Sequence, residues 1–127
     1  MDAITGFELA DGYAVYRPTG QVTFDGALAL VSAAIAHARE RGISKLLIDS
    51  TALTGLGPAI STWDRFRFAE QMARVAMSSV VLAMVAHPGL IDERRFGVTV
   101  ARNRGMMAGI FATEAEALAW LMDPRRT

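Results

Sequence analysis

Cysteine is absent from this chain of 127 residues, and only two histidines, His37 and His87, are present. Without cysteine the chain can form neither a disulfide framework nor a thiolate metal site. Two histidines are also too few for a histidine-rich metal site, so we expect no metal and no cofactor. Basic and acidic residues balance at 13 each. We therefore expect no nucleic-acid partner, since nonspecific nucleic-acid binding needs a basic face.

Long apolar segments are missing as well. The chain has no run of about 18 or more apolar residues, the length that a membrane-spanning helix needs. Its first residues lack the basic and apolar blocks of a signal peptide. We therefore expect a cytoplasmic protein with no membrane span. The composition, 52% hydrophobic and 20% charged, excludes a disordered chain, and the length predicts a single domain over residues 1–127.

Strand and helix signals alternate along the chain. Asp11-Gly12 between two apolar runs predicts an antiparallel hairpin. Apolar residues then recur at helical spacing from Phe24 to Ala38, with Thr23 as the N-cap. The later patterns predict strands at residues 46–48, 80–86 and 106–111, and helices at residues 61–74, 92–104 and 114–122. This order predicts an α/β fold, a mixed sheet with an N-terminal hairpin and then βα crossovers, with about five strands and four helices.

The same order bears on assembly. If the strands add in sequence order with one crossover hand, the helices gather on one face of the sheet. The runs at residues 46–48 and 80–86 are apolar on both faces, which is typical of buried parallel strands. Something must then cover the other face, and a second subunit is a candidate. We therefore predict a homodimer.

Small polar residues and glycines follow the strand at residues 46–48. In open parallel sheets, ligands and partners bind just past the carboxyl ends of the strands. The next strand ends at the same edge with His87, and the following helix begins at Ser61, which forms a capping box with Asp64. The candidate partner- or ligand-binding residues at this edge are Asp49, Ser50, Thr51, Thr54, Gly55, Gly57, Ser61, Arg65 and His87.

Signatures of chemistry are weak. The chain has no Gly-x-Gly-x-x-Gly after the first strand and no phosphate-loop lysine motif, so nucleotide binding lacks its usual signature. His87 with Asp49 or Asp92 has the composition of an acid–base pair, but no nucleophile can be assigned to it. We expect no catalytic residue and no enzyme. Arg95, Thr99 and Arg102 share one face of the predicted helix, which is either solvated or able to hold a phosphate or an acidic partner.

Four segments taken together, residues 20–27, 45–53, 88–105 and 111–121, carry a resemblance to a known group. The chain resembles the STAS-domain proteins, typified by anti-sigma-factor antagonists, and more closely their SpoIIAA-like (STAS/SEC14-like) branch. The resemblance implies a noncatalytic regulatory or protein-interaction module. In the antagonists, a serine in an Asp-Ser-Ser-Gly-like motif is phosphorylated by a partner kinase. The equivalent place here falls near Gly57, where there is no hydroxyl, so that switch cannot be carried over.

Two functions stay open. The domain can dock a protein partner, or a copy of itself, through the loop after Ile48 and the adjoining helix. Alternatively it holds a small apolar ligand or lipid, as the resemblance to SEC14-like domains suggests. The helix that follows Ser61 carries an apolar stripe that begins with Trp63. The residues predicted to line such a ligand pocket are Trp63, Phe66, Phe68, Met72, Met84 and Phe96.

Overall fold

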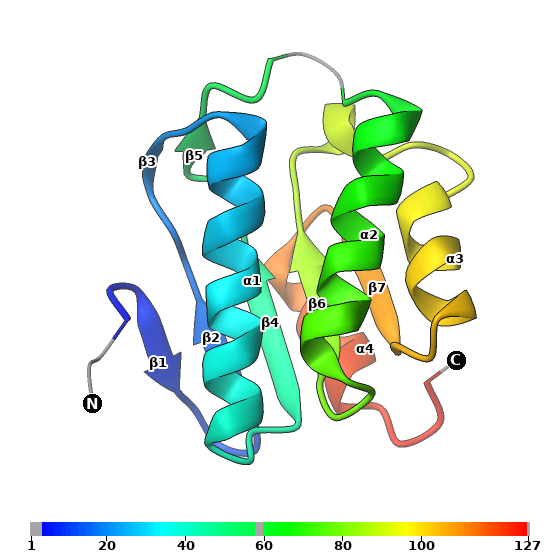
Figure 1. Cartoon of the computed structure of the whole chain (residues 1–127). Coiled ribbons are helices and arrows are strands. Elements are labelled where there is room, and N and C mark those ends of the chain that lie inside the picture. The colour runs from blue at the N-terminus through cyan, green and yellow to red at the C-terminus, as the bar shows by residue number, and fades with distance from the viewer. Residues whose placement is uncertain (1–3, 58–59, 127) are drawn as a thin grey trace.

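A computed structural model describes residues 4–57 and 60–126 of the chain, in which strands and helices alternate (Figure 1). The described residues form seven strands, four α-helices and one short 3-10 helix, η1. In chain order the elements are β1 (Phe7–Leu9), β2 (Ala14–Tyr16), β3 (Gly20–Gln21), α1 (Phe24–Glu40), β4 (Lys45–Asp49), β5 (Leu53–Thr54), α2 (Thr62–Ala76), β6 (Val81–Val85), η1 (Pro88–Leu90), α3 (Phe96–Asn103), β7 (Ala108–Phe111) and α4 (Glu114–Met122).

The main sheet has the strand order β1-β2-β4-β6-β7. β1 and β2 form the antiparallel hairpin predicted from Asp11-Gly12, and the other neighbouring strands pair in parallel. In the register of these pairs, Leu47 lies opposite Val15 on one side and Ala83 on the other. The predicted α/β fold, a mixed sheet with an N-terminal hairpin followed by βα crossovers, is therefore confirmed. The carboxyl ends of β2, β4, β6 and β7 meet at one edge of the sheet.

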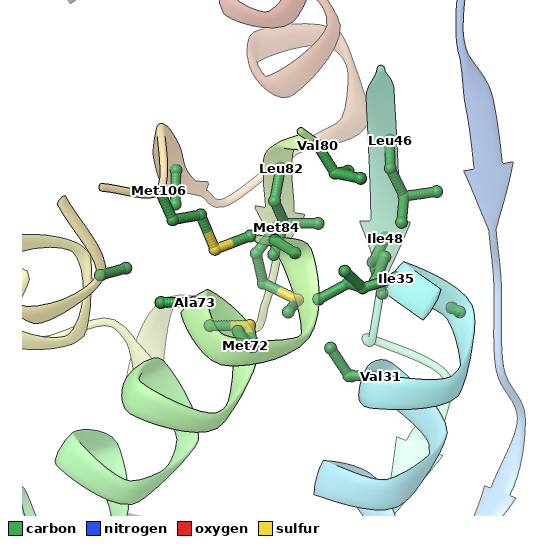
Figure 2. Packing of buried hydrophobic residues seen from close by; sticks show 14 of the residues in the cluster. Val31, Ile35, Leu46, Ile48, Met72, Ala73, Val80, Leu82, Met84 and Met106 are labelled. Atoms are coloured by element: carbon green, nitrogen blue, oxygen red, sulfur yellow. The ribbon is translucent and has the colours of Figure 1, made fainter. Parts of the chain in front are cut away.

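The two faces of the sheet have different covers, because side chains alternate between faces along a strand. Leu46 and Ile48 face α1, α2 and α3 and belong to the larger core, where Figure 2 shows Ile48 beside Ile35 of α1. Leu47, between them in sequence, belongs to a second core with Ala117 and Leu121 of α4. A continuous apolar run in β4 thus supplies both layers at once.

α4 corrects the premise of the dimer prediction. We expected the second face of the sheet to need a partner subunit, but α4 crosses behind the sheet and packs on β4, β6 and β7 (Figure 1). Leu121 and Ala117 of α4 are fully buried there. The physical reason is that α4 follows the last strand and connects no two strands. The crossover rule that places α1, α2 and α3 on one face therefore does not apply to it. The homodimer stays a prediction, but an open sheet face no longer supports it.

Three other details differ from the sequence-based expectations. The loop after β4 contains β5, which pairs in parallel with β3 in a separate two-stranded sheet. The third helix begins at Phe96 and not at Asp92, because the Asp92 carboxylate accepts the amide of Phe96 from outside the helix. Trp63 lies on the predicted inward stripe of α2, yet it is 66% exposed. The buried residues of α2 begin only at Ala69, so its first turn extends beyond the core.

Candidate functional site

The polar residues after β4 separate onto two sides of the sheet. Leu47 and Ile48 already face opposite cores, and the alternation continues past the strand. Asp49 lies toward the beginning of α4, whereas Ser50 lies on the side of α1, α2 and α3, where its hydroxyl donates to the Val85 carbonyl at 2.8 Å. The candidate residues that sequence grouped together therefore form two distinct sites.

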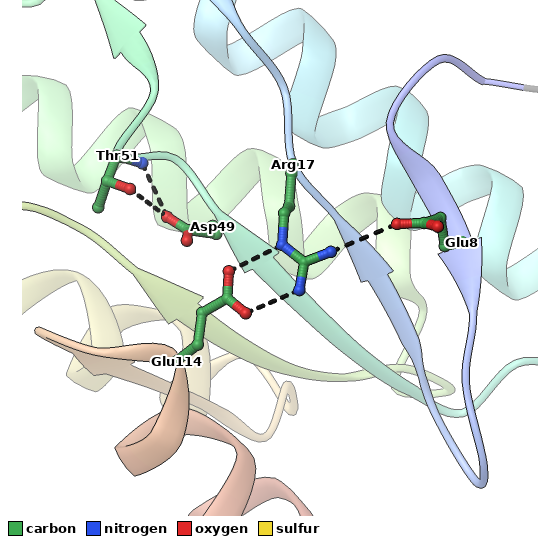
Figure 3. Close-up of polar contacts among 5 residues, drawn as sticks. All are labelled: Glu8, Arg17, Asp49, Thr51 and Glu114. Carbon is green, nitrogen blue, oxygen red and sulfur yellow. Dashed lines mark hydrogen bonds and ion pairs between the residues drawn. The ribbon is translucent and has the colours of Figure 1, made fainter.

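The first site is an ionic cluster around Asp49 and Arg17 (Figure 3). One Asp49 oxygen accepts the amide of Thr51 at 2.9 Å and its hydroxyl at 2.6 Å. The Arg17 guanidinium donates two hydrogen bonds to the Glu114 carboxylate, at 2.9 and 2.8 Å, and one to Glu8 at 3.3 Å. Arg17 thus joins the end of β2 to the first residue of α4. Such a cluster positions α4 against the sheet edge.

The electrostatics of this cluster favour the ionised form of Asp49. Burial alone would raise the pKa of Asp49, but three other influences oppose it. They are hydrogen bonding with the Glu114 carboxyl, the two hydrogen bonds from Thr51, and the charge of Arg17. Together they lower the pKa below its ordinary value of 3.8. Hydrogen bonding to Glu114 in turn raises the pKa of Arg17.

His87 lies at the same edge as Asp49 but is not paired with a carboxylate among the described residues. Its Nε2 atom is 2.9 Å from the carbonyl oxygen of Thr51. The Asp92 carboxylate instead contacts Arg65 and the Phe96 amide. Neither arrangement is the acid–base pair that the residue types suggested, because a general base must be oriented toward a proton that it removes.

Four of the candidate residues shape the loop between β4 and α2. The Thr54 carbonyl accepts the amide of Val22, which joins the loop to the start of α1. Gly55 has φ +97°, and a side chain there would collide with the Val22 carbonyl. Gly57 also has a positive φ, of 76°. The Ser61 hydroxyl accepts the Asp64 amide at 3.0 Å and so caps α2 as predicted.

Arg65 connects the loops at this edge. Its guanidinium donates to the Ile60 carbonyl at 2.6 Å and to the Leu90 carbonyl at 2.8 Å. The same group lies 3.4 Å from Asp92, and the Arg65 side chain is only 17% exposed. One side chain of α2 therefore ties the residues before its own helix to η1 and to the segment that leads into α3.

The second site is an apolar cavity of about 130 Å³ that opens to solvent and is lined by residues of α1, α2, α3, the sheet and these loops. Ser50 and Arg65 lie at its polar end. Three residues predicted to line a pocket, Phe68, Met72 and Met84, do line it. Trp63, Phe66 and Phe96 are not among the lining residues. Trp63 and Phe66 instead stack on each other with ring centroids 5.5 Å apart, and Arg104 lies 5.2 Å from the centre of the Phe66 ring.

Sequence reasoning missed two residues of these sites, Arg17 and Glu114, and it misplaced a third, Arg95. Arg17 and Glu114 are 97 residues apart, and no local pattern could have paired them. Arg95 lies before α3 with φ 46°, and so it is not on the helical face with Thr99 and Arg102 to which we assigned it. It lines the cavity instead. A glutamate at the start of a helix was the available signal for Glu114, since acidic residues favour that position.

Within residues 4–57 and 60–126, no three acidic or histidine side chains gather closely enough to hold a metal ion. The same residues contain no helix that is long and apolar enough to cross a bilayer. These findings concern geometry alone.

Comparison with known proteins identifies the fold class and no family. No family model matches the chain, and no curated protein sequence matches it. The architecture defines an α/β protein with a mixed sheet, and a solved structure shares it. The NMR structure of the protein TM1081 superposes with a TM-score of 0.50 over 95% of this chain and 90% of that one, at 12% sequence identity. At that identity the similarity shows the fold alone.

Proposed function

We propose that this protein is a noncatalytic binding domain that holds a small apolar ligand in the cavity beneath its carboxyl-edge loops. The cavity is the observation that supports this proposal. It lies where ligands bind in parallel sheets, just past the strand ends, and its walls are mostly apolar with a few polar groups at one end, as is typical of ligand sites. The fold is consistent with the STAS/SEC14-like resemblance, which remains part of the proposal.

The size of the cavity also supports a ligand. A cavity of about 150 Å³ lined by aliphatic and aromatic side chains stays dry when empty and binds benzene, and the cavity here measures about 130 Å³. The lining side chains Met72 and Met84 are flexible and polarisable, so they adapt to different apolar shapes. We therefore propose a ligand about the size of benzene.

Benzene itself is a suitable neutral probe. We expect it to raise the melting temperature of the protein in a concentration-dependent manner and to shift the ¹³C-methyl NMR signals of Met72 and Met84, while that of the exposed Met77 stays unchanged. Ala69→Leu, which fills the cavity from α2, should abolish both effects. Ala33→Leu, on the exposed side of α1, is the matched control. A wild-type protein that shows neither effect would contradict the proposal.

A protein partner is a second candidate function, and Trp63 is the observation that favours it. Tryptophan is highly buried on average and is enriched in the centres of protein interfaces, yet Trp63 is 66% exposed on α2. It stacks on Phe66, and the pair forms an aromatic surface beside the candidate loops. We propose a second copy of this chain as the partner. The interface of the predicted homodimer would then contain Trp63 and Phe66 and not the sheet face that α4 covers.

Sedimentation velocity tests this second candidate. We expect the wild type to sediment as a dimer at micromolar concentration, and Trp63→Ser to sediment as a monomer with unchanged circular dichroism. Met77→Ser is the matched control, because Met77 is 67% exposed at the other end of α2. A monomeric wild type, or a dimer that survives Trp63→Ser, would refute this contact.

A further inference from the structure

The polar end of the cavity contains four side chains, and three of them already have partners. Among the lining residues these four are Ser50, Arg65, Asp92 and Arg95. The Ser50 hydroxyl donates to the Val85 carbonyl. Arg65 and Asp92 contact each other, and each also has a backbone partner. The hydrogen-bonding capacity of these three groups is thus largely committed to the fold.

Arg95 is different. Arg95 lines the cavity but is exposed to solvent, and within the described parts of the chain its guanidinium makes no hydrogen bond and no ion pair. Its backbone is in the left-handed region, at φ 46°, which non-glycine residues rarely adopt. The neighbouring contacts fix that conformation, since the Arg95 amide donates to the Asp92 carbonyl and the Phe96 amide donates to the Asp92 carboxylate. Unfavourable backbone conformations that the surroundings enforce occur preferentially at functional sites.

The charges at this end of the cavity define the head group of a ligand. Arg65 and Asp92 neutralise each other at 3.4 Å, and no described residue forms an ion pair with Arg95. A guanidinium matches the two oxygens of a carboxylate with two parallel hydrogen bonds. Among the described lining residues, a head group with two negative charges would meet one unpaired cation, Arg95, and would lie near the Asp92 carboxylate. A singly charged carboxylate fits this arrangement best.

We infer that the cavity binds a small monocarboxylic acid, with its apolar body among Phe68, Met72 and Met84 and its carboxylate on Arg95. This inference rests on the ligand-binding function proposed above and names its chemical class. The volume of the cavity limits the apolar body to about six carbon atoms, the size of benzene. Hexanoate is therefore an appropriate probe, and hexanol is its uncharged counterpart with a body of the same length.

The experiment compares these two probes by isothermal titration calorimetry and by the methionine methyl shifts. We expect wild-type protein to bind hexanoate about three- to fivefold more tightly than hexanol, which corresponds to one ion pair with an exposed arginine. Arg95→Ala should remove this preference by weakening hexanoate alone, and Arg95→Lys should restore part of it. Arg94→Ala is the matched control, because Arg94 is an exposed neighbour that does not line the cavity. It should leave both affinities within about twofold.

The possible outcomes distinguish the carboxylate inference from the ligand-binding function on which it rests. The carboxylate assignment would be overturned if hexanoate and hexanol bound equally, or if the preference for hexanoate persisted in Arg95→Ala. Benzene binding would in that case still support the ligand-binding function. If Arg94→Ala weakened hexanoate binding as much as Arg95→Ala does, the preference would come from general surface charge. That result would also overturn the carboxylate assignment. No methyl shift at Met72 or Met84 with benzene, hexanol or hexanoate would overturn both proposals. Circular dichroism and melting temperature establish that each variant is folded.

Discussion

Replacing Arg65 with methionine keeps a long side chain at this position but removes the guanidinium that joins three segments. The variant loses the hydrogen bonds to the Ile60 and Leu90 carbonyls and the contact with Asp92. Hydrogen bonds that involve a charged group contribute roughly 1.5–3 kcal/mol each. Arg65 is partly accessible, so we take the lower end for the two bonds and discount the Asp92 contact, since that carboxylate is 31% exposed. The free energy of unfolding should fall by about 3 kcal/mol.

Urea unfolding followed by far-ultraviolet circular dichroism measures this loss. Arg74→Met is the matched control on the same helix, because Arg74 is 71% exposed and its contact with Glu70 is long, at 3.9 Å. Substitutions at such surface positions usually change the free energy of unfolding by less than about 0.5 kcal/mol. Arg65→Met should therefore shift the midpoint far more than Arg74→Met does.

Hydrogen exchange locates the effect. The amides of Leu90 and Ile91 donate within η1, to His87 and Pro88, and Arg65 holds this turn through the Leu90 carbonyl. In Arg65→Met these two amides should exchange faster than the global loss of stability explains. Equal destabilisation by the Arg65 and Arg74 variants, or unchanged relative protection of η1, would refute the argument that Arg65 ties these loops together.

Two further predictions concern α4 and the ionic cluster. Leu121→Ala should lower the free energy of unfolding by about 2–5 kcal/mol, since Leu121 is fully buried against the sheet; in urea unfolding, the partly exposed Met122 should tolerate the same change, and equal losses would contradict the buried position of α4. The pKa of Asp49 is lowered in the folded protein, so its charge stabilises the fold above the ordinary pKa, and this contribution is lost as the pH falls through the folded pKa. The difference in unfolding free energy between wild type and Asp49→Asn should therefore shrink below about pH 4, and a difference independent of pH would contradict it.

The starts of α1 and α4 were among the most predictable parts of the structure, because their signals are local. Thr113 and Glu116 predict a capping box, and their side chains hydrogen-bond each other while the Glu116 amide donates to Thr113. The observed helix then has the predicted bounds, Glu114–Met122. Thr23 caps α1 in the same way. When a cap and a helical stripe lie within a few residues of each other, the local sequence determines where the helix begins.

Features that depend on distant contacts were not predictable. β3 and β5 have two residues each, too few for a periodic pattern, and they form only because the loops after β2 and β4 meet. The spacing of α2 correctly placed Trp63 on the apolar stripe, but spacing does not report where the core ends. The start of α3 was misplaced because an aspartate near a helix terminus can either belong to the first turn or cap it from outside.

The sequence predicted which candidate residues meet at the carboxyl edge of the sheet but could not divide them between its two faces. Parallel strands place their carboxyl ends together, so Asp49, Ser50 and His87 were rightly brought to one edge. The alternation of a strand sends consecutive residues to opposite faces, and this separates Asp49 from the cavity that Ser50 lines. α4 covers one face of the sheet, and no residue near β4 indicates where α4 packs.

The proposed difference between Arg65 and Arg95 rests on their contacts in the fold and not on residue type. Both are arginines at the carboxyl edge. From sequence we named Arg65 as a candidate binding residue, and we placed Arg95 on a helix face that is either solvated or able to hold an anion. The fold gives Arg65 two carbonyls and a carboxylate, so using it for a ligand would require breaking contacts that hold the loops together. Arg95 has no such contact among the described residues, and a ligand carboxylate would gain a hydrogen-bonded ion pair there without displacing an internal one. The net gain on binding is therefore larger at the arginine that the fold leaves unpartnered.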